Sequence, residues 1–112
     1  MQTGRLEKLL EFIKNEPRDP FLKYALATEY LRLNEPAKAL EYYEDLANNH
    51  PGYTGTYYHL GKLYESLGRS PDAIKTYETG MKITREKRDN HAFSELRAVY
   101  NELTGTEEDD EY

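Results

Sequence analysis

This 112-residue chain has three histidines, His50, His59 and His91, whose side chains could act in acid–base catalysis or bind a metal ion. No two of them are three or four residues apart, which is the spacing that places two metal ligands on one face of a helix. The chain has no cysteine, which excludes disulfides, thiolate metal sites and cysteine nucleophiles. We therefore expect no metal site and no cofactor.

The serines and glycines also lack the neighbours that catalysis would require. Ser66, Ser70 and Ser94 lie in no nucleophile motif. Gly52 and Gly55 flank a turn, but the G-x-x-x-x-G-K pattern of a phosphate-binding loop is missing there. We therefore predict that the protein is not an enzyme and has no catalytic residues.

The net charge of −6 is concentrated near the end of the sequence. Residues 107–111 read EEDDE, and without them the chain is nearly neutral. A nearly neutral body lacks the basic surface that nucleic acids require, so we expect no nucleic-acid partner. We interpret residues 106–112 as a disordered acidic tail that aids solubility. Binding of this tail to a groove, or to the basic run near residues 82–88, stays open.

The hydrophobic pattern contains no membrane segment. No apolar run approaches the roughly 20 residues that a membrane-spanning helix needs. Acidic residues interrupt the start MQTGRLEKLLEF, where a signal peptide would need a continuous apolar core. We therefore expect a soluble cytoplasmic protein without a membrane partner.

The chain resembles itself after a shift of 34 residues. The matching pairs include Tyr24 and Tyr58, Leu26 and Leu60, Tyr30 and Tyr64, Ala39 and Ala73, and Tyr43 and Tyr77. A fixed period of this size is typical of stacked structural repeats. Apolar residues in each copy recur at helical spacing, and Pro36 and Gly68 mark helix boundaries. We predict two helices per copy, packed antiparallel because their connections are short.

These positions resemble the tetratricopeptide repeat, whose pattern is W-x2-L-G-x2-Y, then A-x3-F, then P. The second copy matches through Tyr57, Leu60, Gly61, Tyr64, Ala73 and Tyr77. The first copy matches through Leu26, Ala27, Tyr30, Ala39, Tyr43 and Pro51. Lys23 departs from the aromatic position, and Arg85 replaces the second closing proline. The resemblance implies an all-α fold, with antiparallel helix pairs stacked in a right-handed superhelix.

The flanking segments add one helix at each end of the two full repeats. Residues 5–15 match the second helix of a repeat, and the segment HAFSELRAVYNEL has first-helix spacing. We therefore predict about six helices in a single domain over residues 1–105. Its parts are a half repeat at 4–17, repeats at 20–52 and 54–87, and a capping helix at 90–103. Arg97 falls at the close-packing position of Gly61, so we expect nothing to pack there.

Gly61 interrupts a helical pattern that alanine would favour by about 0.8–1 kcal/mol. The repeat register pairs it with Ala73 of the second helix, as it pairs Ala27 with Ala39. We therefore expect the two helices to approach each other most closely here. On this interpretation alanine is tolerated at position 61 and leucine is not.

In proteins with such repeats, the first helices line a concave groove. The groove residues predicted here are Tyr24, Thr28, Leu31, Arg32, Tyr58, Lys62, Glu65 and Ser66. Aromatic rings beside long cations suit a peptide, because rings supply contact area and cations bind carboxylates. An ordinary amphipathic surface is the alternative interpretation of the same residues.

Some members of this family bind acidic chaperone tails through a clamp of lysines and asparagines. Tyr24, Thr28 and Lys62 stand where clamp residues would be, so the resemblance does not imply that function. We predict a noncatalytic module that binds a peptide or partner protein in the groove. The alternative is a structural module that self-associates through its terminal helices, which leaves a homodimer open.

Overall fold

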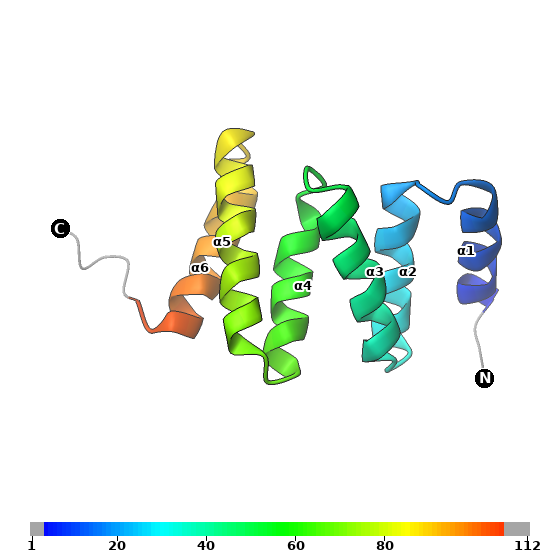
Figure 1. The fold of residues 1–112 in the computed structure, drawn as a ribbon, viewed down its shortest axis with the longest axis horizontal. Coiled ribbons are helices and arrows are strands. Elements are labelled where there is room, and N and C mark those ends of the chain that lie inside the picture. Colours follow the sequence, from blue (N-terminus) through cyan, green and yellow to red (C-terminus); the bar gives the residue numbers. More distant parts are fainter. Residues whose placement is uncertain (1–3, 107–112) are drawn as a thin grey trace. The chain divides into compact units, whose positions relative to one another are not determined.

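The computed structural model describes residues 4–106, which form six α-helices and no strand (Figure 1). The helices are α1 Gly4–Asn15, α2 Pro20–Arg32, α3 Pro36–Asn49, α4 Gly55–Ser66, α5 Ser70–Glu86 and α6 Asn90–Thr104. The predicted all-α repeat fold with six helices is confirmed. Of the predicted acidic tail, residues 107–112 lie outside the described residues.

The chain divides into two compact units, Met1–Tyr53 with α1 to α3 and Thr54–Tyr112 with α4 to α6. In the first unit α2 packs against both α1 and α3. In the second unit α5 packs against both α4 and α6. The helix pairs α2–α3 and α4–α5 are those that the 34-residue period predicts.

Local signals in the sequence start the helices where the structure has them. The Asp19 carboxylate accepts a hydrogen bond of 2.9 Å from the Phe21 N–H, and Asp89 accepts one of 3.1 Å from the Ala92 N–H. These caps satisfy N–H groups that have no partner within their own helices. Prolines in the first turns of α2, α3 and α5 cost no hydrogen bond there.

Three helices end in the same way, with one residue in the left-handed region. Asn34 follows α2 with φ 62°, Gly68 follows α4 with φ 74°, and Arg88 follows α5 with φ 61°. The next N–H then bonds a carbonyl five residues back, as in Glu35 to Tyr30, Arg69 to Tyr64 and Asp89 to Thr84. This arrangement satisfies carbonyls at the helix ends. The prediction of Gly68 as a helix stop is confirmed.

The repeat positions form the core of each unit. In the first unit the completely buried side chains are Leu26, Ala27, Ala39, Tyr43 and Leu46, and α1 adds Leu6 and Leu9. In the second unit the buried side chains include Tyr57, Leu60, Ala73, Tyr77 and Leu96. Burying a large apolar side chain contributes roughly 1.5–3 kcal/mol to stability. Packing of the two helices in each repeat therefore stabilises both units.

Gly61 is buried where α4 meets α5, and its nearest neighbour is the Tyr77 ring, which the sequence did not indicate. A Cβ added to Gly61 would lie 2.6 Å from Cζ and 2.7 Å from Cδ1 of the Tyr77 ring. Close packing at Gly61 is therefore confirmed, and the Tyr77 ring supplies the nearest atoms. The expectation that alanine is tolerated is wrong, because even a methyl group overlaps a completely buried ring.

Gly80 is a second close-packing glycine, which the sequence did not reveal. A Cβ on Gly80 would lie 2.5 Å from the Tyr57 Cβ and 2.9 Å from the Leu96 Cδ1. Gly80 therefore lets α4 and α6 approach the same turn of α5. Its counterpart 34 residues earlier is Leu46, so the repeat gave no indication of a small residue.

The last helix turns one face to the core and another outward. Leu96 and Val99 of α6 are buried, whereas Arg97 is exposed. Arg97 aligns with Gly61 of α4. The Tyr77 ring packs over Gly61, whereas the Arg97 side chain is exposed, so α4 and α6 differ in packing at this repeat position.

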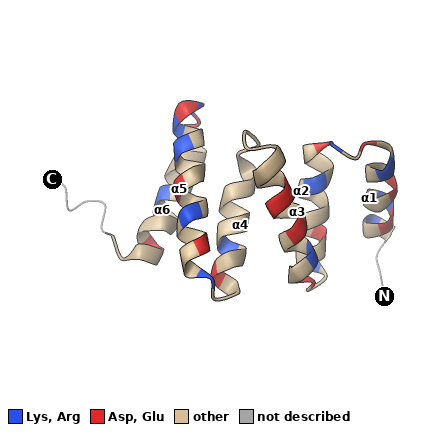
Figure 2. Cartoon of the chain, in the orientation of Figure 1, with Lys and Arg blue, Asp and Glu red and all other residues tan. Residues whose placement is uncertain are grey.

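Charged side chains occur on every helix of the described chain (Figure 2). The predicted basic run lies at the C-terminal end of α5, and its four side chains, Lys82, Arg85, Lys87 and Arg88, are exposed. Within residues 4–106, no helix is long and apolar enough to cross a membrane.

Candidate functional site

The buried ring of Tyr43 carries a hydroxyl from α3 to the surface of α2. Its oxygen lies 3.2 Å from the Thr28 hydroxyl, within hydrogen-bond distance. Burial raises the pKa of Tyr43 above its usual value, although the hydrogen bond with Thr28 opposes the change. The phenol therefore stays neutral at physiological pH. Thr28, a predicted groove residue, is exposed and held by a core side chain.

Tyr24 belongs to a cluster of three tyrosines in the first unit. Its ring centroid lies 6.3 Å from that of Tyr43, with the planes at 69°, and 5.7 Å from that of Tyr53. These distances are in the range of favourable aromatic contacts. The cluster leaves Tyr24 half-buried and orients its ring. Tyr53 lies in the connection after α3, and the sequence did not indicate its contact with Tyr24.

Two large apolar side chains are exposed at either end of this surface of α2. Phe21 is 59% exposed and Leu31 is 36% exposed. Phe21, Tyr24, Thr28 and Leu31 follow one another at steps of three, four and three residues, so they share one helix face. Leu31 is a predicted groove residue, whereas the sequence analysis did not include Phe21. Phe21 lies three residues before Tyr24, and this helical spacing could have indicated that the two residues share a face.

Arg32 serves mainly as the partner of a buried carboxylate. Glu29 is only 2% exposed, and Arg32 donates to both of its oxygens, at 3.2 and 2.5 Å. Arg5 of α1 adds a third contact at 3.2 Å. The hydrogen bond with Glu29 raises the pKa of Arg32. A ligand carboxylate would therefore compete with Glu29 for this predicted groove cation.

In the second unit, the ring of Tyr77 reaches the surface of α4 in the same manner. Its hydroxyl donates a hydrogen bond of 2.5 Å to the Glu65 carboxylate. The pKa of Tyr77 is strongly raised, mainly because the phenol is buried and also because it donates this hydrogen bond to Glu65. Lys62 is exposed, and its Nζ lies 4.0 Å from the same carboxylate. The two predicted groove residues Lys62 and Glu65 thus form one charged group on α4.

The remaining predicted residues of α4 contribute less to the surface. Tyr58 is half-buried, with its ring centroid 5.5 Å from that of His59. Burial lowers the pKa of His59, although the charge of Glu95 opposes this, so the imidazole is neutral near pH 7. The Ser66 hydroxyl donates to the Leu63 carbonyl at 2.8 Å. Ser66 therefore uses its donor within its own helix.

Two family models described as tetratricopeptide repeat match the chain, over residues 20–63 and 54–87. The crystal structure of a tetratricopeptide repeat domain protein from Salinibacter ruber is 46% identical, with a TM-score of 0.76. That match covers 80% of this chain and 100% of the other. The chain belongs to the tetratricopeptide repeat family. A solution NMR structure from the same organism agrees, at 46% identity and TM-score 0.76, covering 81% and 92% of the two chains.

A more distant neighbour of this tetratricopeptide repeat protein supports the fold alone. The solution structure of a Bordetella parapertussis protein is 21% identical, with a TM-score of 0.77. The match covers 93% of this chain and 90% of that one. No curated protein matches the chain.

Family membership identifies a protein-interaction module. Tetratricopeptide repeats generally bind protein partners and form noncatalytic scaffolds. Within residues 4–106, no group of three or more histidine, aspartate or glutamate side chains is arranged to hold a metal ion.

Lys23 occupies the position where the tetratricopeptide pattern has an aromatic residue. It is buried, and its Nζ lies 2.8 Å from the Asp45 carboxylate and 3.5 Å from the His50 Nε2. Burial alone would raise the pKa of Asp45, but hydrogen bonds from Lys23 and Asn49 outweigh it and lower the pKa. The aliphatic stem of Lys23 thus fills the aromatic position while its charge is paired on α3.

Proposed function

We propose that the protein binds a peptide, or an exposed segment of a partner protein, on the first helices α2 and α4 of its repeats. The observation that carries this proposal is the apolar face of α2. Phe21 and Leu31 are two of the four large hydrophobic side chains that are exposed among the described residues. Two exposed apolar side chains on one helix face, with the half-buried Tyr24 ring between them, favour a binding surface over an ordinary solvated face.

The α2 surface suits an extended peptide with two apolar side chains. Phe21 and Leu31 are ten residues apart, which is about 15 Å along a helix. An extended chain of four or five residues spans about the same length. Tyr24 and Thr28 lie between them and are held by Tyr43, so little side-chain entropy is lost when a ligand binds.

The α4 surface, considered by itself, suits polar side chains of a ligand. Lys62 and Glu65 offer one cation and one anion, and the anion is fixed by Tyr77. Lys62 and Arg32 each lie beside a carboxylate, so neither belongs to a basic patch of the kind that binds a nucleic-acid backbone. The proposed partner is therefore a protein segment. A segment bound on α2 needs apolar side chains, and one bound on α4 needs polar ones.

A displayed library of random peptides of roughly 12 residues tests this proposal. Peptides enriched on the wild-type protein are titrated against Phe21→Ala, Leu31→Ala and the double variant Tyr24→Ala plus Tyr58→Ala. Each variant should weaken binding about tenfold, because each removes apolar or aromatic contact area from the proposed surface. Phe12→Ala is the matched control, since Phe12 is also exposed, at 54%, but lies on α1. Enriched peptides that bind all variants equally, or no enrichment at all, would refute the proposal.

Self-association through α1 is a second candidate, favoured by one observation. Phe12 aligns with Leu46, which is completely buried in the complete repeat, yet Phe12 is 54% exposed. Beside it lies a hollow of about 350 Å³ lined by Gly4, Arg5, Lys8, Leu9 and Phe12. A second copy could cover this surface. Sedimentation over a range of concentrations checks it, and a concentration-independent monomer excludes it.

A further inference from the structure

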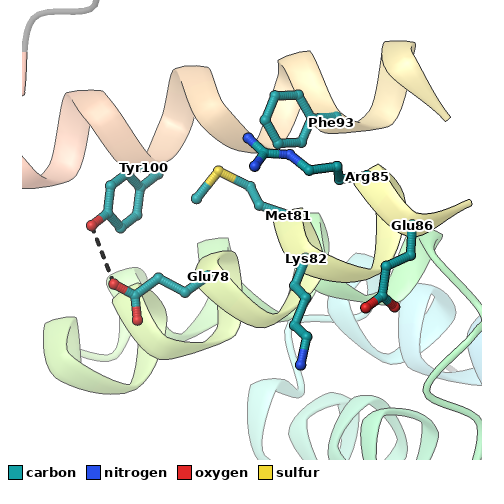
Figure 3. A pocket seen from close by; sticks show the side chains of 7 residues that line it. All are labelled: Glu78, Met81, Lys82, Arg85, Glu86, Phe93 and Tyr100. Carbon is teal, nitrogen blue, oxygen red and sulfur yellow. Dashed lines mark hydrogen bonds between the residues drawn. The ribbon is translucent and has the colours of Figure 1, made fainter. Parts of the chain in front are cut away.

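A hollow of about 420 Å³ lies between α5 and α6 in the second unit (Figure 3). Its lining residues are Glu78, Met81, Lys82, Arg85, Glu86, Phe93 and Tyr100. Figure 3 shows the Met81 side chain between the two helices, with Phe93 and Tyr100 of α6 on either side of it. The hollow therefore has an apolar floor. It is distinct from the α2 and α4 surfaces described above.

Two guanidinium groups flank the Phe93 ring at one end of this hollow. The Arg85 Cζ lies 4.8 Å and the Arg97 Cζ 5.6 Å from the ring centroid. Within residues 4–106, Arg85 makes this cation–π contact and no ion pair. Stacked guanidiniums are partly desolvated and still have N–H groups that can bind carboxylates. This end of the hollow therefore favours an anionic ligand.

The carboxylates of the hollow do not cancel this preference. The Tyr100 hydroxyl donates a hydrogen bond of 3.2 Å to Glu78, at the far end from Phe93. Glu86 lines the hollow on α5, but in Figure 3 its side chain points away from α6. Arg85, by contrast, points at the Phe93 ring. The positive charge is thus nearest to the exposed aromatic surface.

The helix α6 ends one turn after Tyr100. Gly105 has φ 78°, a left-handed conformation that ends α6. The Thr104 hydroxyl donates to the Tyr100 carbonyl at 2.9 Å and lies 2.9 Å from the Thr106 hydroxyl. These contacts hold Thr106 against the last turn of the helix. The residues that follow, 107–111, are all acidic.

The acidic residues are long enough to reach the guanidiniums. Five extended residues span at most about 17 Å. Thr106 contacts Thr104, and Phe93 precedes Thr104 by eleven residues, which is about 16.5 Å along α6. An extended segment that starts at Thr106 and follows α6 is therefore just long enough to bring its last carboxylates to the guanidiniums beside Phe93.

We propose that residues 107–111 bind in the α5–α6 hollow of their own chain, with carboxylates paired to the Arg85 and Arg97 guanidiniums that flank Phe93. The segment then covers Met81 and Phe93. Because it is tethered next to its site, its effective concentration is high and even weak ion pairs hold it. Salt screens such pairs, so the contact weakens as ionic strength rises.

A spin label on the acidic segment tests this contact in the full chain. The chain has no cysteine and only two methionines, Met1 and Met81, so Tyr112→Cys carries a single nitroxide and ¹³C-methyl methionine reports on the hollow. The matched control carries the same label with residues 107–111 changed to glutamine and asparagine. At low salt we expect the Met81 signal of the acidic chain to be at least about twofold weaker than that of the neutral control. The difference should vanish at about 0.5 M NaCl.

Variants of the cations locate the contact. Arg85→Gln should remove most of the difference, whereas Lys38→Gln, an exposed lysine on α3, should leave it unchanged. Equal Met81 intensities in the acidic and neutral chains would overturn the proposal. So would a signal loss that arises only when spin-labelled and ¹³C-labelled molecules are mixed, because the contact would then be intermolecular.

Discussion

Tyr77 of α5 donates a 2.5 Å hydrogen bond to Glu65 of α4, and its ring also lies over Gly61. One buried side chain therefore holds the two helices of the second repeat together and fixes a carboxylate on the proposed binding surface. Tyr43 has the same position in the first repeat, but its hydroxyl meets the neutral Thr28 at 3.2 Å. The two repeats thus share a core residue and present different groups to a ligand.

Tyr77→Phe tests the stabilising part of this contact. The variant keeps the ring and removes the hydroxyl that donates to a carboxylate. We therefore expect the free energy of unfolding, measured by urea titration, to be about 1.5–3 kcal/mol lower than in wild type. Tyr43→Phe removes a bond to a neutral hydroxyl and should cost about 0.5–1.5 kcal/mol. If Tyr43→Phe costs more than Tyr77→Phe, the hydrogen bond to Glu65 is not the stronger of the two.

Three buried tyrosines predict a loss of stability in alkali. Burial raises the pKa of Tyr43, Tyr57 and Tyr77 in the folded protein. In the unfolded chain these tyrosines lose their protons near pH 10. Their contribution to the free energy of unfolding is therefore fully present below about pH 10 and is lost as the pH rises through their higher pKa values in the folded protein. We expect the free energy of unfolding to fall above this pH, and to fall less steeply in Tyr77→Phe. An identical slope in both proteins would contradict this account.

Much of the architecture followed from sequence, because the 34-residue period lies in the core. Tyr43 and Tyr77, for example, are buried at matching positions, as the register predicts. The surface was harder to predict, since its residues differ between the repeats. Phe21 has Gly55 as its counterpart in the second repeat, so the repeat pattern does not mark it. Arg32 forms an ion pair with the buried Glu29, which the 34-residue period did not predict. Such contacts depend on the length and conformation of individual side chains, and a repeat pattern carries no information about either.

The Lys23–Asp45 ion pair predicts a loss of stability in acid. The pKa of Asp45 is lowered in the folded protein, so its contribution is present above about pH 4 and is lost as the pH falls through the folded value. Between about pH 5 and 2, we expect wild type to lose more unfolding free energy than Asp45→Asn. Glu41→Gln, an exposed change on the same helix, controls for the loss of one charge. Equal losses in wild type and Asp45→Asn would show that the pair does not stabilise the fold.

Gly61→Ala should destabilise the protein, although alanine is the better helix former. The helix gains about 1 kcal/mol from the substitution. The new Cβ, however, overlaps the buried Tyr77 ring, and overpacking of this kind typically costs about 1–3 kcal/mol. The Tyr77 ring cannot swing away freely, because its hydroxyl is bound to Glu65. We therefore expect a lower melting temperature than for wild type.

Two further variants separate the overlap from the effect of helix propensity. Gly4→Ala is the matched control, because a Cβ on Gly4 would meet no atom within 4 Å, and it should leave the melting temperature unchanged or raise it. In a Tyr77→Leu background the ring is absent, so adding Gly61→Ala should be neutral or stabilising. If Gly61→Ala instead destabilises both backgrounds equally, the two residues are not coupled and the contact with Tyr77 does not explain the glycine.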